Sequence, residues 1–348
     1  MRHFFLLFFI IFTTTGSPEK RKKEGYRKMQ GYLPEGMLQG TDENRALTQS
    51  AAGLERAILN CRIVEGIAAL CDGDLSLHVD FGGPVPGLIR REEVLLRRSD
   101  ESGKEIAVIS RVGKPISARV VSLEHRGSGT VAVLSRRMAQ EDCRRDYLSR
   151  LRPGDLIPAR VTHLEPFGAF LDIGCGLVSL LSVDCISVSR LAHPRDRLTV
   201  GMDLTVAVKS TDPESGRIYV TLRELLGTWE ENAALFHAGQ TVTGILRSVE
   251  SYGAFVELTP NLAGLAEIHG EAHAAELRAA VGKGAAVYIK SILPERMKIK
   301  LVLIDCGFPL TARRELSFFI APPERHISRW VYSPAVSRRI VETRFDPE

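Results

Sequence analysis

The 348-residue chain has few of the features that mark specialised protein classes. It contains only six cysteines and no Cys-x-x-Cys pair, a usage typical of a reduced, intracellular protein and not of a disulfide scaffold. No apolar run reaches the roughly 18 residues that a membrane-spanning helix needs. Because 44% of the residues are hydrophobic and 25% are charged, the composition indicates a soluble globular protein and excludes wholesale disorder.

Positive charge is scarce outside the N-terminus. The chain carries 46 Lys and Arg against 42 Asp and Glu, a formal net charge of +4. Residues 1–28 hold seven of the basic and two of the acidic residues, so residues 29–348 hold 39 basic and 40 acidic residues and have a net charge of −1. Any binding of nucleic acid must therefore come from local faces and not from a generally basic protein.

The basic N-terminal residues 1–28 allow three interpretations. The apolar run 4–12 behind Arg2 resembles the core of a secretory signal peptide, which would make this an exported protein. A membrane anchor would need a longer run. In the third interpretation translation begins at Met29, because residues 23–25 can be encoded by AAGGAGG, a bacterial ribosome-binding sequence, three codons upstream. We expect Met29 to be the start and residues 1–28 to be an upstream mis-start or signal-like leader.

Two ordered repeats span much of the C-terminal half. Phe167-Gly168-Ala169-Phe170 in one copy corresponds to Tyr252-Gly253-Ala254-Phe255, 85 positions later, in the next. Further pairs follow in order: Gly176-Leu177 with Gly264-Leu265, Val200-Gly201 with Val281-Gly282, Val208-Lys209-Ser210 with Ile289-Lys290-Ser291, and Arg217–Leu222 with Lys298–Leu303. Ordered matches over about 70 residues indicate a duplicated structural unit.

A weaker third copy lies upstream, where residues 75–80 and 87–89 give its middle and residues 131–136 its closing strand. Ile67-Ala68-Ala69-Leu70 stands where the other copies have the aromatic segment. Each copy shows short runs with period-two alternation that end at Gly, Pro or Asp turns, which predicts about five strands closed into a small barrel. Helical connectors separate the copies, and Thr228 with Glu231 has the spacing of a capping box.

These motifs resemble the S1 RNA-binding domain, an OB-fold module. The likeness rests on the Gly-Asp/Gln opening, Phe/Tyr-Gly-Ala-Phe, Gly-Leu, Val-Gly and the closing Arg/Lys-Ile pattern, and it is strong over residues 153–305 and moderate over 61–137. Tandem copies resemble the family of bacterial ribosomal protein S1 and its shorter relatives. The resemblance implies a mainly β fold of tandem five-stranded OB-fold (S1-type) barrels joined by short helices, which bind single-stranded RNA without chemistry.

The repeat boundaries divide the chain into eight segments. They are the leader 1–28, an N-terminal helical or irregular segment 29–60, a degenerate S1-like barrel 61–137, a helical linker 138–152, an S1 domain 153–226, a helical linker 227–238, an S1 domain 239–305 and a C-terminal tail 306–348.

The C-terminal tail interleaves arginines with aromatic residues, a composition that suits RNA binding. The aromatics are Phe318, Phe319, Trp330 and Tyr332. Packing of the tail on the third barrel or on a partner is the alternative that we favour, because Pro322-Pro323 and Pro334 break it into short pieces.

The aromatic segments predict a surface on which bases stack. If Leu171 fills the barrel, its neighbour Phe170 points outward, because successive side chains of a strand alternate. Gly168 permits a bend that brings the preceding ring to the same side. The alternative is that the rings complete the barrel core, whereas the resemblance favours stacking. The candidate stacking residues are Phe167, Phe170, Tyr252 and Phe255.

Basic residues near the closing strands are candidate phosphate contacts. They are Lys209, Arg217, Lys290 and Lys298. For each one the alternative is solvated surface charge. In the resembling family a histidine follows the Gly-Leu pair on the binding face, and here Ser179 and Glu267 take that position, where an acid would repel phosphate. The family's Asp before the closing basic residue is matched by Asp212 and replaced in the last copy by Leu293.

Enzymatic motifs are missing from the sequence. His269 and His273 flank Glu271 in the order His-x-Glu-x-His, which differs from the His-Glu-x-x-His of zinc proteases and predicts a surface helix or turn. Gly282-Lys283-Gly284 lacks the rest of a phosphate-binding loop. We expect no enzymatic activity, and no cofactor, metal, membrane or small-molecule substrate.

With the resemblance, these features predict a cytoplasmic bacterial protein that binds single-stranded RNA or mRNA on its second and third barrels, in translation at the small (30S) ribosomal subunit. The alternative is a non-enzymatic adaptor whose degenerate barrels dock on ribosome, polymerase or ribonuclease proteins. The first barrel has neither the aromatics nor the histidine, so we expect it to be a structural or docking module.

Overall fold

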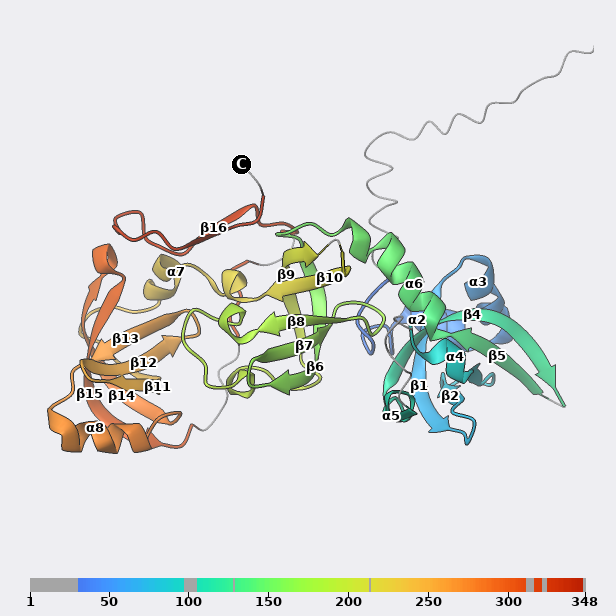
Figure 1. The fold of residues 1–348 in the computed structure, drawn as a ribbon, viewed down its shortest axis with the longest axis horizontal. Coiled ribbons are helices and arrows are strands. Elements are labelled where there is room, and N and C mark those ends of the chain that lie inside the picture. The colour runs from blue at the N-terminus through green and yellow to red at the C-terminus, as the bar shows by residue number, and fades with distance from the viewer. Residues whose placement is uncertain are drawn as a thin grey trace, which may run out of the picture.

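The computed structural model describes residues 31–96, 105–127, 129–212, 214–310, 316–320 and 324–346. Within these ranges the chain forms three closed barrels in a row and a two-stranded sheet near the C-terminus (Figure 1). The mainly β fold of tandem five-stranded barrels is therefore confirmed. The expected leader 1–28 and the start at Met29 lie outside the described residues.

The first barrel follows two helices, α2 (Asp42–Thr48) and α3 (Ala51–Leu59). Its strands are β1 (Ile63–Cys71), β2 (Leu77–Asp80), β3 (Gly87–Ile89), β4 (Pro115–Arg126) and β5 (Gly129–Ser135). Two short helices, α4 (Arg91–Val94) and α5 (Glu105–Ile109), lie between β3 and β4.

The second barrel follows α6 (Arg136–Asp146) and the 3-10 turn η1 (Leu148–Arg150). Its strands are β6 (Leu156–Glu165), β7 (Gly168–Asp172), β8 (Val178–Ser182), β9 (Asp203–Asp212) and β10 (Arg217–Thr221). The 3-10 turns η2 (Val183–Cys185) and η3 (Pro194–Asp196) lie between β8 and β9, and η4 (Arg223–Leu226) follows β10.

The third barrel follows α7 (Trp229–Ala233). Its elements are β11 (Thr241–Glu250), β12 (Gly253–Thr259), β13 (Leu262–Ala266), α8 (Gly270–Ala279), β14 (Gly284–Leu293), η5 (Pro294–Arg296) and β15 (Lys298–Phe308). The two-stranded sheet of the tail pairs β16 (Arg329–Val331) with β17 (Glu342–Arg344).

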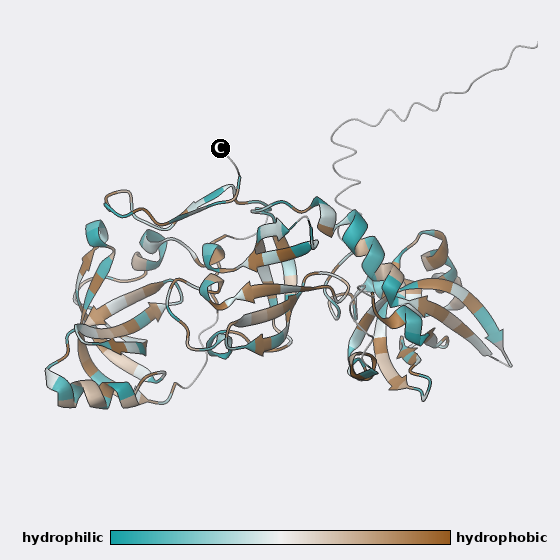
Figure 2. Cartoon of the chain, in the orientation of Figure 1, coloured by the Kyte–Doolittle hydropathy of each residue, from teal (hydrophilic) through white to brown (hydrophobic). Residues whose placement is uncertain are grey.

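All three barrels share one topology. The first three strands pair antiparallel in a meander, the third pairs parallel with the fifth, and the fourth closes the barrel between the fifth and the first. Alternate residues of the strands face inward, so Leu171 and Ile173 are fully buried, as the alternation predicted. Figure 2 shows apolar residues concentrated on the barrel strands and a mostly hydrophilic α6.

The helical connectors belong to the barrels that they join. Ala139 and Cys143 on α6 are fully buried, and Cys143 lies in the core of the second barrel. The capping box predicted for the next connector is confirmed. Thr228 Oγ1 accepts a hydrogen bond from the backbone N–H of Glu231, and the Glu231 carboxylate accepts one from the backbone N–H of Thr228. No helix in the described ranges is long and apolar enough to cross a bilayer.

The strand register corrects one expected match between the repeats. Phe170 faces Leu180 on β8, and Phe255 faces Leu265 on β13, ten residues further along in both copies. Gly264-Leu265 therefore corresponds to Ser179-Leu180. The expected partner, Gly176-Leu177, lies in and beside the turn before β8, where Gly176 has a positive φ of 75°. Cross-strand pairing, and not the local Gly-Leu pattern, determines the correspondence.

A second correction concerns the first barrel. His78 on β2 faces Leu70 on β1 and Leu88 on β3, as Phe170 faces its neighbours in the second barrel. The aromatic segment is thus replaced by Leu75–His78. The expected replacement, Ile67–Leu70, lies on the preceding strand. The expectation that this barrel lacks the aromatic pair is confirmed.

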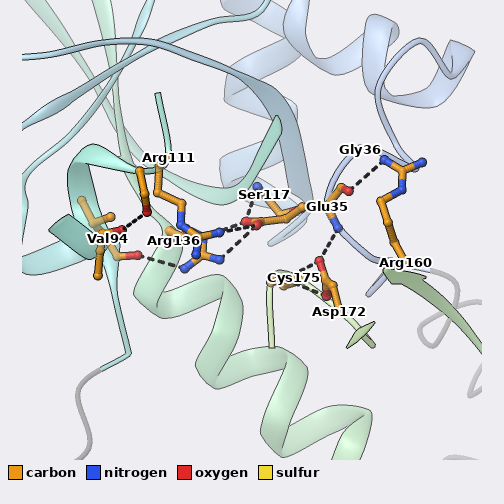
Figure 3. A network of polar contacts seen from close by, with 12 residues as sticks. Glu35, Gly36, Val94, Arg111, Ser117, Arg136, Arg160, Asp172 and Cys175 are labelled. Atoms are coloured by element: carbon orange, nitrogen blue, oxygen red, sulfur yellow. Dashed lines mark hydrogen bonds and ion pairs between the residues drawn. The ribbon is translucent and has the colours of Figure 1, made fainter. Parts of the chain in front are cut away.

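A buried polar network joins the first two barrels (Figure 3). Glu35, which precedes α2, accepts hydrogen bonds from Arg136 at the start of α6, with Nε–Oε1 at 2.6 Å and Nη2–Oε2 at 3.0 Å. The backbone N–H of Glu35 donates to Asp172 at the end of β7, 2.7 Å away. All three side chains are buried, so the segment before α2 ties the two barrels together.

Glu65 on β1 holds the same segment from the side of the first barrel. Its carboxylate accepts hydrogen bonds of 2.6 Å from the backbone N–H groups of Gly36 and Gln39, and one of 3.1 Å from the Ser117 hydroxyl. Burial raises the pKa of Glu65 despite these hydrogen bonds, which act in the opposite direction. On the other side, Arg160 of the second barrel donates to the backbone oxygen of Glu35 at 3.0 Å.

A buried ion pair joins the second and third barrels. Arg197, just after η3, binds Glu257 on β12 through two parallel hydrogen bonds of 2.9 and 2.6 Å. Arg247 on β11 donates to the same carboxylate at 2.8 Å. Asn261, between β12 and β13, accepts from the backbone N–H of Val188 at 3.0 Å and thereby adds a contact from the second barrel.

The C-terminal tail packs on the last two barrels. Trp330 and Tyr332 are buried in the core of the third barrel, and the Tyr332 hydroxyl donates to the backbone oxygen of Asn261 at 2.6 Å. The backbone N–H of Ile327 donates to the backbone oxygen of Gly154, in the second barrel, at 2.9 Å. Packing, the alternative that we favoured for the tail, is confirmed for these residues.

Candidate nucleic-acid interface

Phe167 and Phe170 lie together on the outer face of the second barrel. Phe170 is half-buried on β7, and Phe167, just before that strand, is 55% exposed. Their ring centroids are 6.0 Å apart and the rings are perpendicular. A Cβ atom on Gly168 would come within 2.5 Å of the backbone oxygen of Leu181, so only glycine allows this close approach of β7 to β8. Neither ring belongs to the barrel core.

Tyr252 and Phe255 repeat this geometry in the third barrel. Tyr252 is 67% exposed, and the two perpendicular rings have centroids 6.1 Å apart. Gly253 lies between them with a φ of 158°, and a Cβ atom there would come within 2.6 Å of Leu265. Two barrels thus carry the same pair of rings, placed by the same use of glycine.

One ring of each pair, Phe170 or Phe255, is part of a row that crosses its barrel from strand to strand. In the second barrel the row is His163, Phe170, Leu180, Tyr219 and Ser210. In the third it is Ser248, Phe255, Leu265, Lys300 and Ser291. The row contains functional candidates that reasoning from single strands missed, namely His163, Tyr219 and Lys300.

His163 and Tyr219 extend the aromatic surface of the second barrel. The His163 ring stacks on Phe170 with centroids 6.2 Å apart and an angle of 29° between the ring planes. Its Nε2 lies 2.6 Å from the Glu165 carboxylate. Tyr219 lies between two inward-pointing residues of β10, so its own side chain faces outward.

The cations predicted for the second barrel are exposed at two different places. Lys209 lies in a bulge of β9, where Ser210 and Val208 pair with consecutive residues of β10, and its ammonium lies 3.1 Å from the thiol of Cys185. Arg217 begins β10 and pairs with Asp212 across the turn. The Asp212 carboxylate holds that turn, and hydrogen bonds from residue 215, aided by the charge of Arg217, lower its pKa.

The cations predicted for the third barrel converge on one groove. Lys290 lies in the corresponding bulge of β14, and Lys298 begins β15. Both line a groove of about 200 Å³ together with Lys300 and Glu267. The groove therefore holds more positive charge than sequence reasoning predicted, although the expected acid, Glu267, is present.

Ser179 is not on the interface. Its side chain is buried, and its hydroxyl donates to the backbone oxygen of Ile218 at 2.6 Å. The expectation that Ser179 takes the place of the family histidine is therefore wrong, because the register makes Ser182 the counterpart of Glu267. Ser182 is partly exposed and donates to Asp184.

The first barrel has a different outer face. His78, at the position of Phe170, lies 2.6 Å from the carboxylate of Asp72. Val121 stands in the bulge that holds a lysine in the other barrels, and it is 45% exposed. Leu70, which pairs with His78 from β1, is 54% exposed. This face is apolar where the others carry rings and cations.

The two histidines of the third barrel lie at the start of α8, which agrees with the predicted surface helix or turn. His269 and His273 stack with ring centroids 6.1 Å apart. Among the described residues no cluster of three or more His, Cys, Asp or Glu could hold a metal ion.

Comparison with known proteins identifies similar chains. The chain is 29% identical over 231 residues to small ribosomal subunit protein bS1 of Staphylococcus aureus, a match that covers 65% of this chain and 56% of that protein. It is 32% identical over 226 residues to the bS1 of Staphylococcus haemolyticus, which covers 63% and 54%. The resemblance to bacterial ribosomal protein S1 is thus confirmed. The chain spans about half the length of these relatives, and no family model matches it.

Solved structures align with the chain at low scores. A multidomain protein with nucleic acid binding domains from Streptococcus pneumoniae is 15% identical and covers 70% of this chain and 73% of its own, with a TM-score of 0.23. GSP13 from Bacillus subtilis is 24% identical and covers 21% and 57%, with a TM-score of 0.21. The assignment of the fold rests instead on the strand pairing of the chain itself.

Proposed function

We propose that the chain binds single-stranded RNA on the outer faces of its second and third barrels. The observation that carries the proposal is the duplicated aromatic pair, perpendicular rings with centroids 6.0 and 6.1 Å apart around a glycine that the packing requires. Each base that stacks on such a ring contributes roughly 1–3 kcal/mol. Lys and Arg side chains near the closing strands neutralise the phosphates.

The two barrels contribute differently to this binding. In the second barrel the row includes His163 and Tyr219, so three rings cross the face and base stacking dominates. In the third barrel Ser248 and Lys300 take those two places, so a single ring lies in the row and phosphate contacts carry more of the affinity. The second barrel should therefore show the weaker dependence on salt.

We place this binding in the cytoplasm, in the translation of mRNA at the small ribosomal subunit. The proposal is supported by the 29–32% identity to proteins named small ribosomal subunit protein bS1. The net charge of −1 over residues 29–348 agrees with recognition by two local faces and not with a bulk electrostatic attraction.

A second candidate function is that of a non-enzymatic adaptor, which docks on ribosome, polymerase or ribonuclease proteins. The observation that favours it is the apolar outer face of the first barrel, where Leu70 is exposed beside His78 and Val121 is exposed on β4. Co-sedimentation with ribosomal subunits tests it. Loss of sedimentation in L70S/V121S, with RNA binding unchanged, would support docking through this face.

Binding of a single-stranded RNA at several salt concentrations tests the RNA proposal. The quadruple variant F167A/F170A/Y252A/F255A should bind at least 100-fold more weakly than wild type with a similar salt slope, because stacking depends little on ionic strength. The variant L59A/L235A, which truncates two exposed apolar residues elsewhere, is the control and should bind like wild type. Equal affinity of wild type and the quadruple variant would overturn the proposal.

A further inference from the structure

The groove beside β15 distinguishes the interface of the third barrel. It has a volume of about 200 Å³ and is lined by residues of β14, of β15 and of the start of α8. The charged and titratable side chains that line it are Glu267, His269, His273, Lys290, Lys298 and Lys300. They come from four parts of the barrel, so the fold itself brings them together.

The groove has an excess of positive charge. Glu267 is the only carboxylate in its lining, and in the described part of the chain none of the three lysines forms an ion pair. With neutral histidines the lining has a charge of about +2 at pH 7. Such an excess, concentrated in a concave site, favours an anion over a cation or an apolar ligand.

His273 adds a hydrogen-bond donor. The backbone N–H of His269 donates to Nδ1 of His273 at 3.2 Å. Because Nδ1 accepts this bond, the proton of the neutral ring lies on Nε2, which can donate. The N-terminal end of the ten-residue helix α8 adds partial positive charge on the same side.

The groove is continuous with the aromatic row. Lys300 pairs with Leu265, and Leu265 pairs with Phe255 on the next strand. Two strand spacings, about 10 Å, therefore separate the backbones of Lys300 and Phe255. An RNA strand whose base stacks on Phe255 can reach the groove with a phosphate near that base.

We propose that this groove binds the terminal phosphate of an RNA strand, a phosphomonoester, while a base near that end stacks on Phe255. The inference rests on the proposed RNA binding. A phosphomonoester carries a charge of about −1.5 to −2 at pH 7 and three strong acceptor oxygens, which match the three ammonium groups and the donor of His273. An internal phosphodiester carries a single negative charge and leaves part of the positive charge uncompensated.

Three RNAs of one sequence test the proposal on the full chain: one with a 5′-phosphate, one with a 3′-phosphate and one with hydroxyls at both ends. We expect one phosphorylated RNA to bind at least tenfold more tightly than the hydroxyl RNA. The variant K290Q/K298Q/K300Q should lose this preference. The matched control K209Q/R217Q, in the second barrel, should weaken binding of all three RNAs and keep the preference. Equal affinities in wild type, or a preference that survives in the triple variant, would overturn the proposal.

A second experiment distinguishes failure of the proposed phosphate site from failure of the proposed RNA binding. Titration with uridine 5′-monophosphate, followed by NMR shifts of the histidine rings, probes the groove without a long strand. If wild type binds no RNA but the nucleotide shifts His273 and the triple variant loses the shift, the phosphate site stands and the RNA function fails. If RNA binds and the nucleotide leaves His273 unshifted, the phosphate site is wrong.

Discussion

Asp172 and Glu257 stand at the same position of two successive repeats, and their carboxyl groups have opposite surroundings. Burial, and then the negative charge of Glu35, raises the pKa of Asp172 to about 7. The nearby guanidinium of Arg136 is hydrogen-bonded to Glu35 instead. Burial also opposes ionisation of Glu257, but hydrogen bonds and charges from two arginines outweigh it and lower its pKa. Each acid lies where its barrel meets the preceding unit, so the two junctions should respond differently to pH.

The junction at Asp172 should weaken as the pH rises from about 4 to about 7. In this range the Asp172 carboxyl is ionised in the unfolded chain and protonated in the folded one, so the folded state binds one more proton. Each pH unit then lowers the free energy of unfolding by up to about 1.4 kcal/mol. Urea denaturation of wild type and D172N at several pH values measures this. The difference between the two should change with pH up to about 7 and level off above it.

A matched control for that experiment is E257Q. Since the pKa of Glu257 is lowered by folding, its contribution is fully present above about pH 5 and is lost only at lower pH. The stability difference between wild type and E257Q should therefore be constant from pH 5 to pH 8. A D172N difference that is equally constant across this range would show that Asp172 is ionised in the folded protein.

E257Q should also be strongly destabilising near neutral pH. The substitution leaves Arg197 and Arg247 buried against a neutral side chain, and breaking a buried ion pair from one side typically costs about 3–5 kcal/mol. E295Q, which changes an exposed acid of the same barrel, should stay within about 0.5 kcal/mol of wild type. Urea denaturation at pH 7 compares the two, and equal stabilities would mean that the ion pair does not hold the junction.

The outward position of Phe170 and Phe255 could be predicted because alternation along one strand decides it. The residues that lie beside these two rings could not be predicted in this way. His163 meets Phe170 only because a bulge between Val161 and His163 shifts the register of β6 against β7, and a bulge leaves no reliable mark in one sequence. Lys300 reaches the row of Phe255 through two strand pairings, so reasoning from single strands missed it.

The contacts at the junctions between the barrels could not be predicted from the spacing of residues in the sequence either. Glu35 and Arg136 are 101 positions apart, and Glu35 and Asp172 are 137 positions apart. Local patterns report neighbours on one helix or strand, whereas these contacts depend on how whole barrels pack. The incorrect match of Gly176-Leu177 with Gly264-Leu265 has the same cause. A short motif in a turn cannot be told from the same motif in a strand until the strand pairing is known.

Gly168→Ala should disrupt the platform of the second barrel. The added Cβ atom would lie 2.5 Å from the backbone oxygen of Leu181 on β8, and backbone cannot move aside as a side chain can. We expect a loss of about 1–3 kcal/mol of stability, typical of overpacking, and weaker RNA binding as β7 moves. Gly73→Ala is the control, since its Cβ atom would meet nothing within 4 Å. Thermal unfolding that is identical for both variants would argue against a steric requirement at Gly168.

Tyr332→Phe should loosen the tail from the third barrel. The hydroxyl of Tyr332 is buried and donates to the backbone oxygen of Asn261 at 2.6 Å, and its removal leaves that acceptor unpaired, at a cost of about 1–3 kcal/mol. Tyr288→Phe, at an exposed tyrosine of the same barrel, should be nearly neutral. Burial raises the pKa of Tyr332, so its hydroxyl ionises more readily in the unfolded chain, and wild type should lose stability above about pH 10. Denaturation at pH 7 and pH 11 measures both effects. Because burial also raises the pKa of Tyr32 and of Tyr147, Y332F should keep part of the alkaline loss but show less of it than Y288F.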